Sequence, residues 1–183
     1  MSYLEAVNSL LASIGEAPVN SIGVGLSESR LAQLTLDRVS RNVQKRGWYF
    51  NTETMTLYPD TNDEVQLPNN TLSVDTDSRR YVQRYGRLYD LHSNTYKFPQ
   101  SVRVQLVLAL EWDALPETVR AYITAKACMR FQAETVGSAQ VDAELAREAS
   151  LAYAELQEEE MEAGNYNMFD NMNLMSDAYL YRR

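Results

Sequence analysis

The periodicity of the apolar residues changes along this chain, and the change limits the folds that it can adopt. Residues 3–14, 27–46, 117–134 and 138–163 place apolar residues three and four positions apart, as amphipathic helices do. Between them, residues 54–110 hold short β-like runs separated by Pro, Asn, Asp and Gly. We therefore expect an α+β, mainly α fold. N- and C-terminal helices would form an antiparallel bundle that carries a β-rich insertion.

Turn residues mark the element boundaries. A glycine follows each helical pattern, as is typical of helix ends: Gly15, Gly47, Gly137 and Gly164. The stretch YVQRYGRLYDL, residues 81–91, predicts a hairpin that turns near its glycine. The apolar positions that we expect in the core from the second helix are Leu31, Leu34, Leu36, Val39 and Val43.

The end of the chain has an unusual composition. Residues 164–183 read GNYNMFDNMNLMSDAYLYRR, which we interpret as lacking the periodicity of a helix or a strand. Disordered termini are usually poor in aromatic residues, so we predict an extended arm that docks on a partner. The alternative is a tail that lies back on its own domain. The expected docking residues are Tyr166, Met168, Phe169, Met172, Leu174 and Tyr179.

The chain is accordingly predicted to have three parts. Residues 1–53 and 111–163 would form the helical bundle, residues 54–110 the β-rich insertion, and residues 164–183 the arm.

Charge is distributed unevenly over the expected helices. The net charge of −8 argues against the basic surface that non-specific nucleic-acid binding needs. Residues 28–47 nevertheless hold five basic and two acidic residues, whereas residues 138–163 hold one basic and eight acidic residues. In a ring, these helices could pair between subunits; in a monomer, both would be solvated faces. The residues predicted to pair are Arg38, Arg41, Lys45, Glu148, Glu155 and Glu159.

The sequence offers little for catalysis or metal binding. The lone cysteine, Cys128, lies inside a helical pattern and is expected to be a buried thiol, and the lone histidine, His92, follows the hairpin. We predict no catalytic residue, no metal site and no cofactor, because a zinc site needs three or four ligands. We also expect no secretory signal and no membrane span, since the longest apolar run is residues 106–110.

Two other functions remain open. Tyr81, Tyr85 and Tyr89 of the hairpin could stack on sugar rings, although hairpin tyrosines more often pack against each other. Paired carboxylates among the many acidic residues could hydrolyse a glycan.

Five segments in order resemble one family. They are AVNSLLASIGEAPVNSI (6–22), RGWYFNTE (46–53), the hairpin sequence (81–91), ALPETVRAYITAKACMRFQAETVG (114–137) and GNYNMFD (164–170). Together they are similar to the tail tubular protein A family, the head-to-tail adaptors of T7-like short-tailed bacteriophages. The departures concentrate in residues 59–78 and after residue 170.

The resemblance implies a structural protein of the virion tail that is made in the host cytoplasm. Copies would form a ring, a dodecamer in the family, between the portal protein and the tail nozzle protein. DNA would pass through the central channel without sequence-specific binding. The ring would help to retain the genome and later to eject it, and the C-terminal arms would reach toward the portal.

Overall fold

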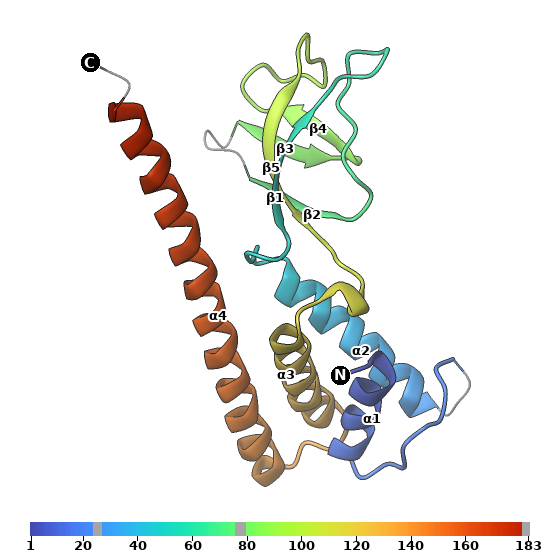
Figure 1. Ribbon diagram of the computed structural model, residues 1–183. Helices are drawn as coiled ribbons and strands as arrows, with labels where there is room; N and C mark the ends of the chain where they lie inside the picture. Colours follow the sequence, from blue (N-terminus) through green and yellow to red (C-terminus); the bar gives the residue numbers. More distant parts are fainter. Residues whose placement is uncertain (24–26, 76–79, 181–183) are drawn as a thin grey trace.

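The fold combines a helical part and a β-rich part (Figure 1). The computed structural model describes the backbone of residues 1–23, 27–75 and 80–180, and the side chains of residues 1–23, 27–74 and 80–164. Its helices are α1 (Tyr3–Ser13), α2 (Ser27–Gln44), the 3-10 turn η1 (Trp112–Ala114), α3 (Glu117–Thr135) and α4 (Ala139–Leu180). Its strands are β1 (Thr52–Leu57), β2 (Thr71–Asp75), β3 (Tyr81–Arg84), β4 (Arg87–Asp90) and β5 (Val102–Leu108). The α+β class is confirmed, whereas the antiparallel order of the whole bundle stays a prediction.

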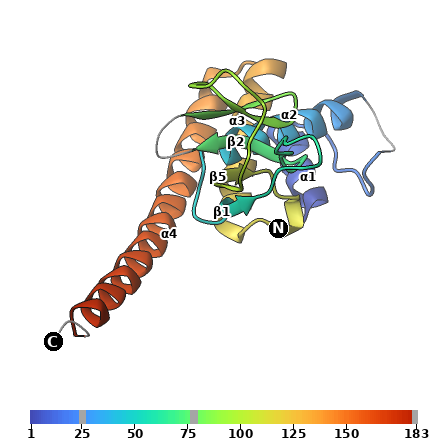
Figure 2. The same ribbon diagram turned by 90° about the horizontal axis from the view of Figure 1, so that it is seen from above.

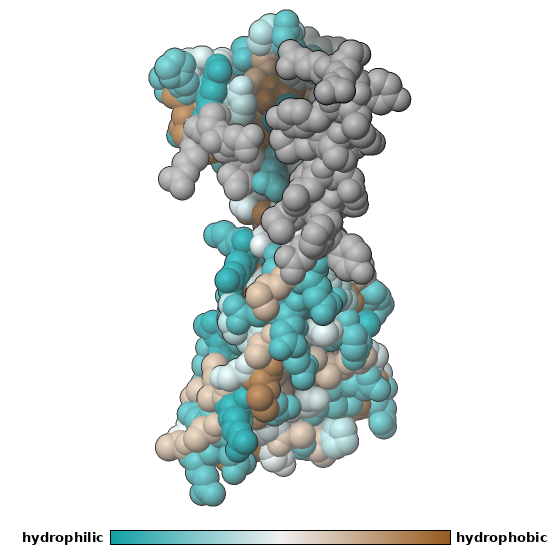
Figure 3. Space-filling view, turned by 60° about the vertical axis from the view of Figure 1, so that its left-hand side comes forward, coloured by the Kyte–Doolittle hydropathy of each residue, from teal (hydrophilic) through white to brown (hydrophobic). Residues whose placement is uncertain are grey.

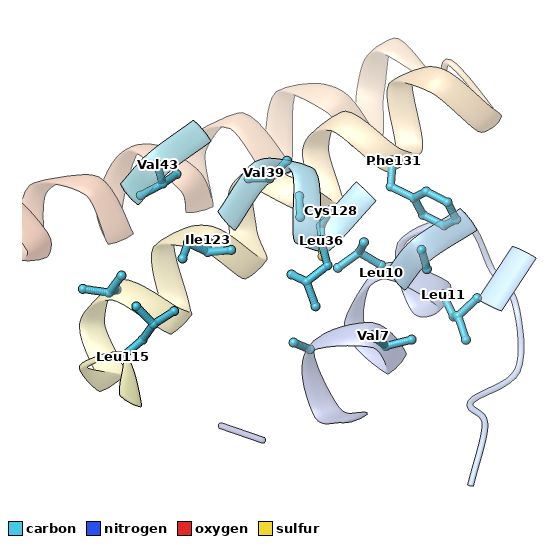
Figure 4. Close-up of a cluster of buried hydrophobic side chains, with 14 of the residues drawn as sticks. Val7, Leu10, Leu11, Leu36, Val39, Val43, Leu115, Ile123, Cys128 and Phe131 are labelled. Atoms are coloured by element: carbon cyan, nitrogen blue, oxygen red, sulfur yellow. The ribbon is translucent and has the colours of Figure 1, made fainter. Parts of the chain in front are cut away.

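Helix α3 is the centre of the helical part, because it contacts α1, α2 and α4. Helix α1 begins at a capping box, in which Ser2 and Glu5 each accept a hydrogen bond from the backbone N–H of the other. Figure 4 shows apolar side chains of α1, α2 and α3 converging on one core. Its fully buried members include Val7, Leu10, Leu36, Ile123 and Phe131.

The predicted core of α2 is partly wrong. The buried apolar residues of this helix are Ala32, Leu36, Val39 and Val43. Leu31 and Leu34 are instead 47% and 57% exposed. The reason is geometric: the buried residues recur at intervals of four, three and four, and the two leucines fall off that stripe.

The β-rich part contains a three-stranded sheet with the antiparallel order β1-β5-β2 and the separate hairpin β3-β4. The hairpin turns through Tyr85 and Gly86, which both have positive φ angles of 53° and 72°. This conformation fits a two-residue turn of the kind that glycine favours. A second core lies between the sheet and the hairpin and includes Val65, Leu88 and Leu106. The predicted hairpin is confirmed, because β3 pairs with β4 in antiparallel register.

A buried asparagine connects the two parts. The Asn51 side-chain amide donates to the carbonyl of Gln44 at the end of α2 (2.9 Å) and to that of Leu108 at the end of β5 (2.8 Å). Its side-chain oxygen accepts from the N–H of Trp48 (2.9 Å). Gly47 has a φ of +77°, and a Cβ there would press against a β5 side chain at 3.0 Å. The junction is therefore closely packed and needs this glycine.

Helix α4 is longer than the sequence pattern predicts. The expected helix ends at Gly164, with an irregular arm beyond it, but the backbone remains helical to Leu180. Gly164 has no positive φ angle, so it does not form the left-handed cap that was expected; glycine inside a helix costs only about 1 kcal/mol. The sequence already held a sign of this helix, because Met168, Met172 and Met175 are spaced at intervals of four and three. Figures 1 and 2 show α4 continuing past α3 and away from the rest of the molecule.

Candidate interaction surfaces

The N-terminal half of α4 is attached firmly to the helical core. Leu156 is completely buried, and the Tyr153 ring packs against the rings of Tyr122 and Trp48 at centroid distances of 5.1 and 6.4 Å. The guanidinium of Arg46 lies over Trp48 and Tyr153, 4.9 and 5.6 Å from the ring centroids. This half of α4 is a fixed base from which the other half projects.

Two glutamates hold the same base to the turn after α2. The Glu159 carboxylate accepts from the hydroxyls of Tyr49 and Thr118, and Glu160 accepts from the backbone N–H of Tyr49 (3.0 Å). Burial, then the bond to Glu159, raises the pKa of Tyr49, so the phenol stays protonated and donates. Glu159 is thus engaged within its own chain. Its role in pairing with a neighbouring subunit stays a prediction.

The other residues of the predicted charge pairing lie on exposed surfaces. Arg38 pairs with Glu134 of α3 at 2.8 Å, so this cation already has a partner. Arg41 and Lys45 are exposed at the C-terminal end of α2. Glu148 and Glu155 are exposed on α4, and no ion pair involves them among the described side chains.

The six predicted docking residues of the arm fall in the projecting half of α4. They are Tyr166, Met168, Phe169, Met172, Leu174 and Tyr179, and their side chains lie outside the described residues. The helical backbone places them beyond the end of α3 (Figure 2). Their docking role stays a prediction.

Two of the hollows that flank the helices lie next to α2. One of about 740 Å³ lies between the helical part and the β-rich part, and its lining includes Asp37, Arg41, Asn70 and Trp112. Another, of about 510 Å³ and mainly apolar, lies between α2, α3 and α4. Neither brings together a nucleophile, a base and an orienting group as covalent catalysis would require.

The hairpin tyrosines do not form a shared platform. Tyr81 packs edge-on against Phe98 at 5.7 Å, and Tyr89 is buried against Tyr96 at 4.7 Å. Tyr85 alone of the three stands free, 88% exposed at the turn. The first two tyrosines therefore serve packing, which leaves one aromatic ring for any sugar.

The cysteine lines a third hollow, of about 410 Å³, which Glu148 of α4 also lines, and the histidine lies in the β-rich part. Cys128 is buried as expected, and burial followed by the nearby Glu148 raises the pKa of its thiol to about 12. His92 is exposed in the loop after β4. Among the described residues, no three acidic, His or Cys side chains are grouped so that they could hold a metal ion. No helix in the described ranges has the length and apolar character of a membrane span.

Sequence reasoning missed the contacts that fix α4. The pair Tyr49 and Glu159 is separated by 110 residues, and Arg46 and Tyr153 by 107. Nothing in a single sequence links such distant positions. The sequence does show the acidic run 158–160, but nothing in it distinguishes a bonded glutamate from a solvated one.

Comparison with known proteins places the chain among phage tail components. The sequence model of the family described as Tail tubular protein matches residues 4–166. The chain is also 32% identical, over 120 residues, to the tail tubular protein A of Klebsiella phage KP34. That alignment covers 64% of this chain and 64% of the relative, which is less than two thirds of the relative's length.

Proposed function

The chain belongs to the tail tubular protein family, and from this premise we propose that its copies form a ring adaptor between the portal and the tail nozzle of a phage. Family membership makes it a structural protein of a phage tail. The finer proposal adds the portal and nozzle proteins as its partners, a dodecameric ring and a central DNA channel. The ring would help to retain the packaged genome and later to release it. The protein would be made in the host cytoplasm and end in the virion tail.

The observation that carries this proposal is the family match, which spans the helical part, the β-rich part and the fixed base of α4. A structural role agrees with the surfaces described above, because they are exposed helix faces and the projecting half of α4. The net charge of −8 is also suited to a channel that DNA slides through, because like charge keeps the polymer from adhering.

The projecting half of α4 supports contact with the portal. A helix that is already formed loses less conformational entropy on docking than an extended arm would. The preformed backbone to Leu180 therefore favours docking more than the irregular arm expected from the sequence. Many such helices on one ring would bind a matching ring multivalently.

Deletion of residues 164–183 tests this role. We expect the truncated protein to keep the circular-dichroism spectrum of a folded helical part and to lose co-sedimentation with portal rings. The matched control removes only residues 181–183 and should bind nearly as the full chain does. Normal binding by the longer deletion would refute a docking role for this half of α4.

A further inference from the structure

Two exposed stripes run along α2 and α4 with matching intervals. On α2 one set of exposed residues recurs at intervals of three, four, three and four, beside the exposed Arg30, Asp37 and Asn42; the set is Leu31, Leu34, Arg38, Arg41 and Lys45. Lys45 directly follows the helix, and its N–H still donates to the Arg41 carbonyl at 2.9 Å. On α4 the intervals are four, three, four, three and four, through Glu144, Glu148, Leu151, Glu155, Glu158 and Glu162. Alternation of three and four is the spacing of a continuous helix-packing seam.

We propose that the α2 stripe of one copy packs in parallel along the α4 stripe of a neighbouring copy, with Leu34 opposite Leu151. This proposal rests on the ring function above and names the contact that builds the ring. From that leucine pair onward the intervals on both helices are four, three and four. The resulting pairs are Arg41 with Glu158 and Lys45 with Glu162, while Arg38, which is bound to Glu134 of its own chain, comes level with Glu155.

Charge complementarity favours a second copy of the chain as the partner of each stripe, and a parallel orientation of the two helices. The parallel register places all three basic residues opposite glutamates. An antiparallel register on the same leucine pair brings Lys45 level with Gln140, so one cation loses its partner. Among the described side chains, Arg41, Lys45, Glu158 and Glu162 make no ion pair within the chain. Charged pairs of this kind fix register and partner choice.

The placement of the two helices suits a contact between copies. Helices α2 and α4 lie on opposite sides of α3, and from N- to C-terminus both run in the same general direction (Figure 1). Each copy therefore offers one stripe on each flank, which is the head-to-tail arrangement that closes into rings. The face over α4 is largely hydrophilic with small apolar patches (Figure 3), as expected for a contact that forms between folded subunits.

Charge reversal tests the register. One variant carries Arg41→Glu and Lys45→Glu, and a second carries Glu158→Lys and Glu162→Lys. At low salt, each should need a protein concentration at least about tenfold higher for half-assembly, because two attractive pairs become repulsive at every interface. Assembly is followed by sedimentation velocity, with the full chain alone and with its portal protein. All four positions are exposed, so the helical circular-dichroism signal should not change.

Recombining the changes separates this register from a general charge effect. A chain with all four reversals should assemble within about threefold of the wild type, since each pair is restored with exchanged signs. The matched control joins the two α2 reversals to Glu144→Lys and Glu148→Lys, which lie out of register, and should remain impaired.

Each outcome decides between the two proposals. If the wild type assembles but the fourfold variant stays impaired, or the out-of-register control recovers equally, this contact is wrong while the ring adaptor stands. If either charge-reversed variant assembles normally, the contact is also wrong. If the wild type assembles neither alone nor with portal, the ring function fails and this inference fails with it.

Discussion

Replacing Leu156 with alanine should loosen α4 from the helical core. This side chain is completely buried and is the α4 member of the helical core cluster. Removal of a buried leucine side chain beyond Cβ costs the lost transfer free energy and leaves a cavity, which together amount to about 2–5 kcal/mol. We expect a loss of about 3 kcal/mol in the free energy of unfolding. The matched control is Met161→Ala, on the same helix but 61% exposed, which should change stability by less than about 0.5 kcal/mol.

Urea unfolding followed by tryptophan fluorescence is the suitable assay. Trp48 is buried in the helical core and Trp112 packs against it, so both chromophores report on this part of the protein. The midpoint should fall for Leu156→Ala with little change in the slope of the transition. Equal stability of the two variants would refute the view that the base of α4 is fixed by core packing.

Three further outcomes follow from the same contacts. Glu159→Ala removes the acceptor of two hydroxyl hydrogen bonds and should lower stability by about 1–3 kcal/mol; Glu158→Ala, at an exposed position, should shift the urea midpoint little, and equal shifts would contradict the network. Arg80 holds the pKa of Asp90 below its ordinary value, so stability from this carboxylate is present above about pH 4 and is lost as the pH falls. The Asp90→Asn variant should therefore be less stable than the wild type at neutral pH and lose less stability on acidification. Acid unfolding followed by near-UV circular dichroism tests this, and the same unfolding curve for the variant and the wild type would argue against it. Cys128 should react with Ellman's reagent at least about a hundredfold more slowly in the native protein than in urea, because the thiol is buried with a raised pKa; rapid native labelling would show that it is accessible.

Local patterns predicted much of the fold. The interval pattern of apolar residues identifies all four helices, and the hairpin sequence identifies its turn at Gly86. Two errors arose where the local pattern allows more than one structure. Leu31 was expected in the core, although it is exposed, because an apolar residue off the buried stripe looks the same in sequence as one on it. Gly164 remains helical because glycine permits a cap without requiring one.

The contacts of the candidate surfaces were less predictable. The sequence identifies the opposed charges of α2 and α4, but it cannot show that Arg38 pairs with Glu134 of α3 or that Glu159 binds Tyr49. These partners depend on how helices that are distant in sequence meet. Exposure alone does not identify them either: Arg38 is exposed and still paired, whereas Arg41 and Lys45 are exposed and make no ion pair among the described side chains.

Electron microscopy of the full chain mixed with its portal protein tests the central proposal most directly. We expect closed rings of this protein stacked coaxially on portal rings, each with an open central channel. Dispersed single copies beside bare portals would contradict a ring adaptor.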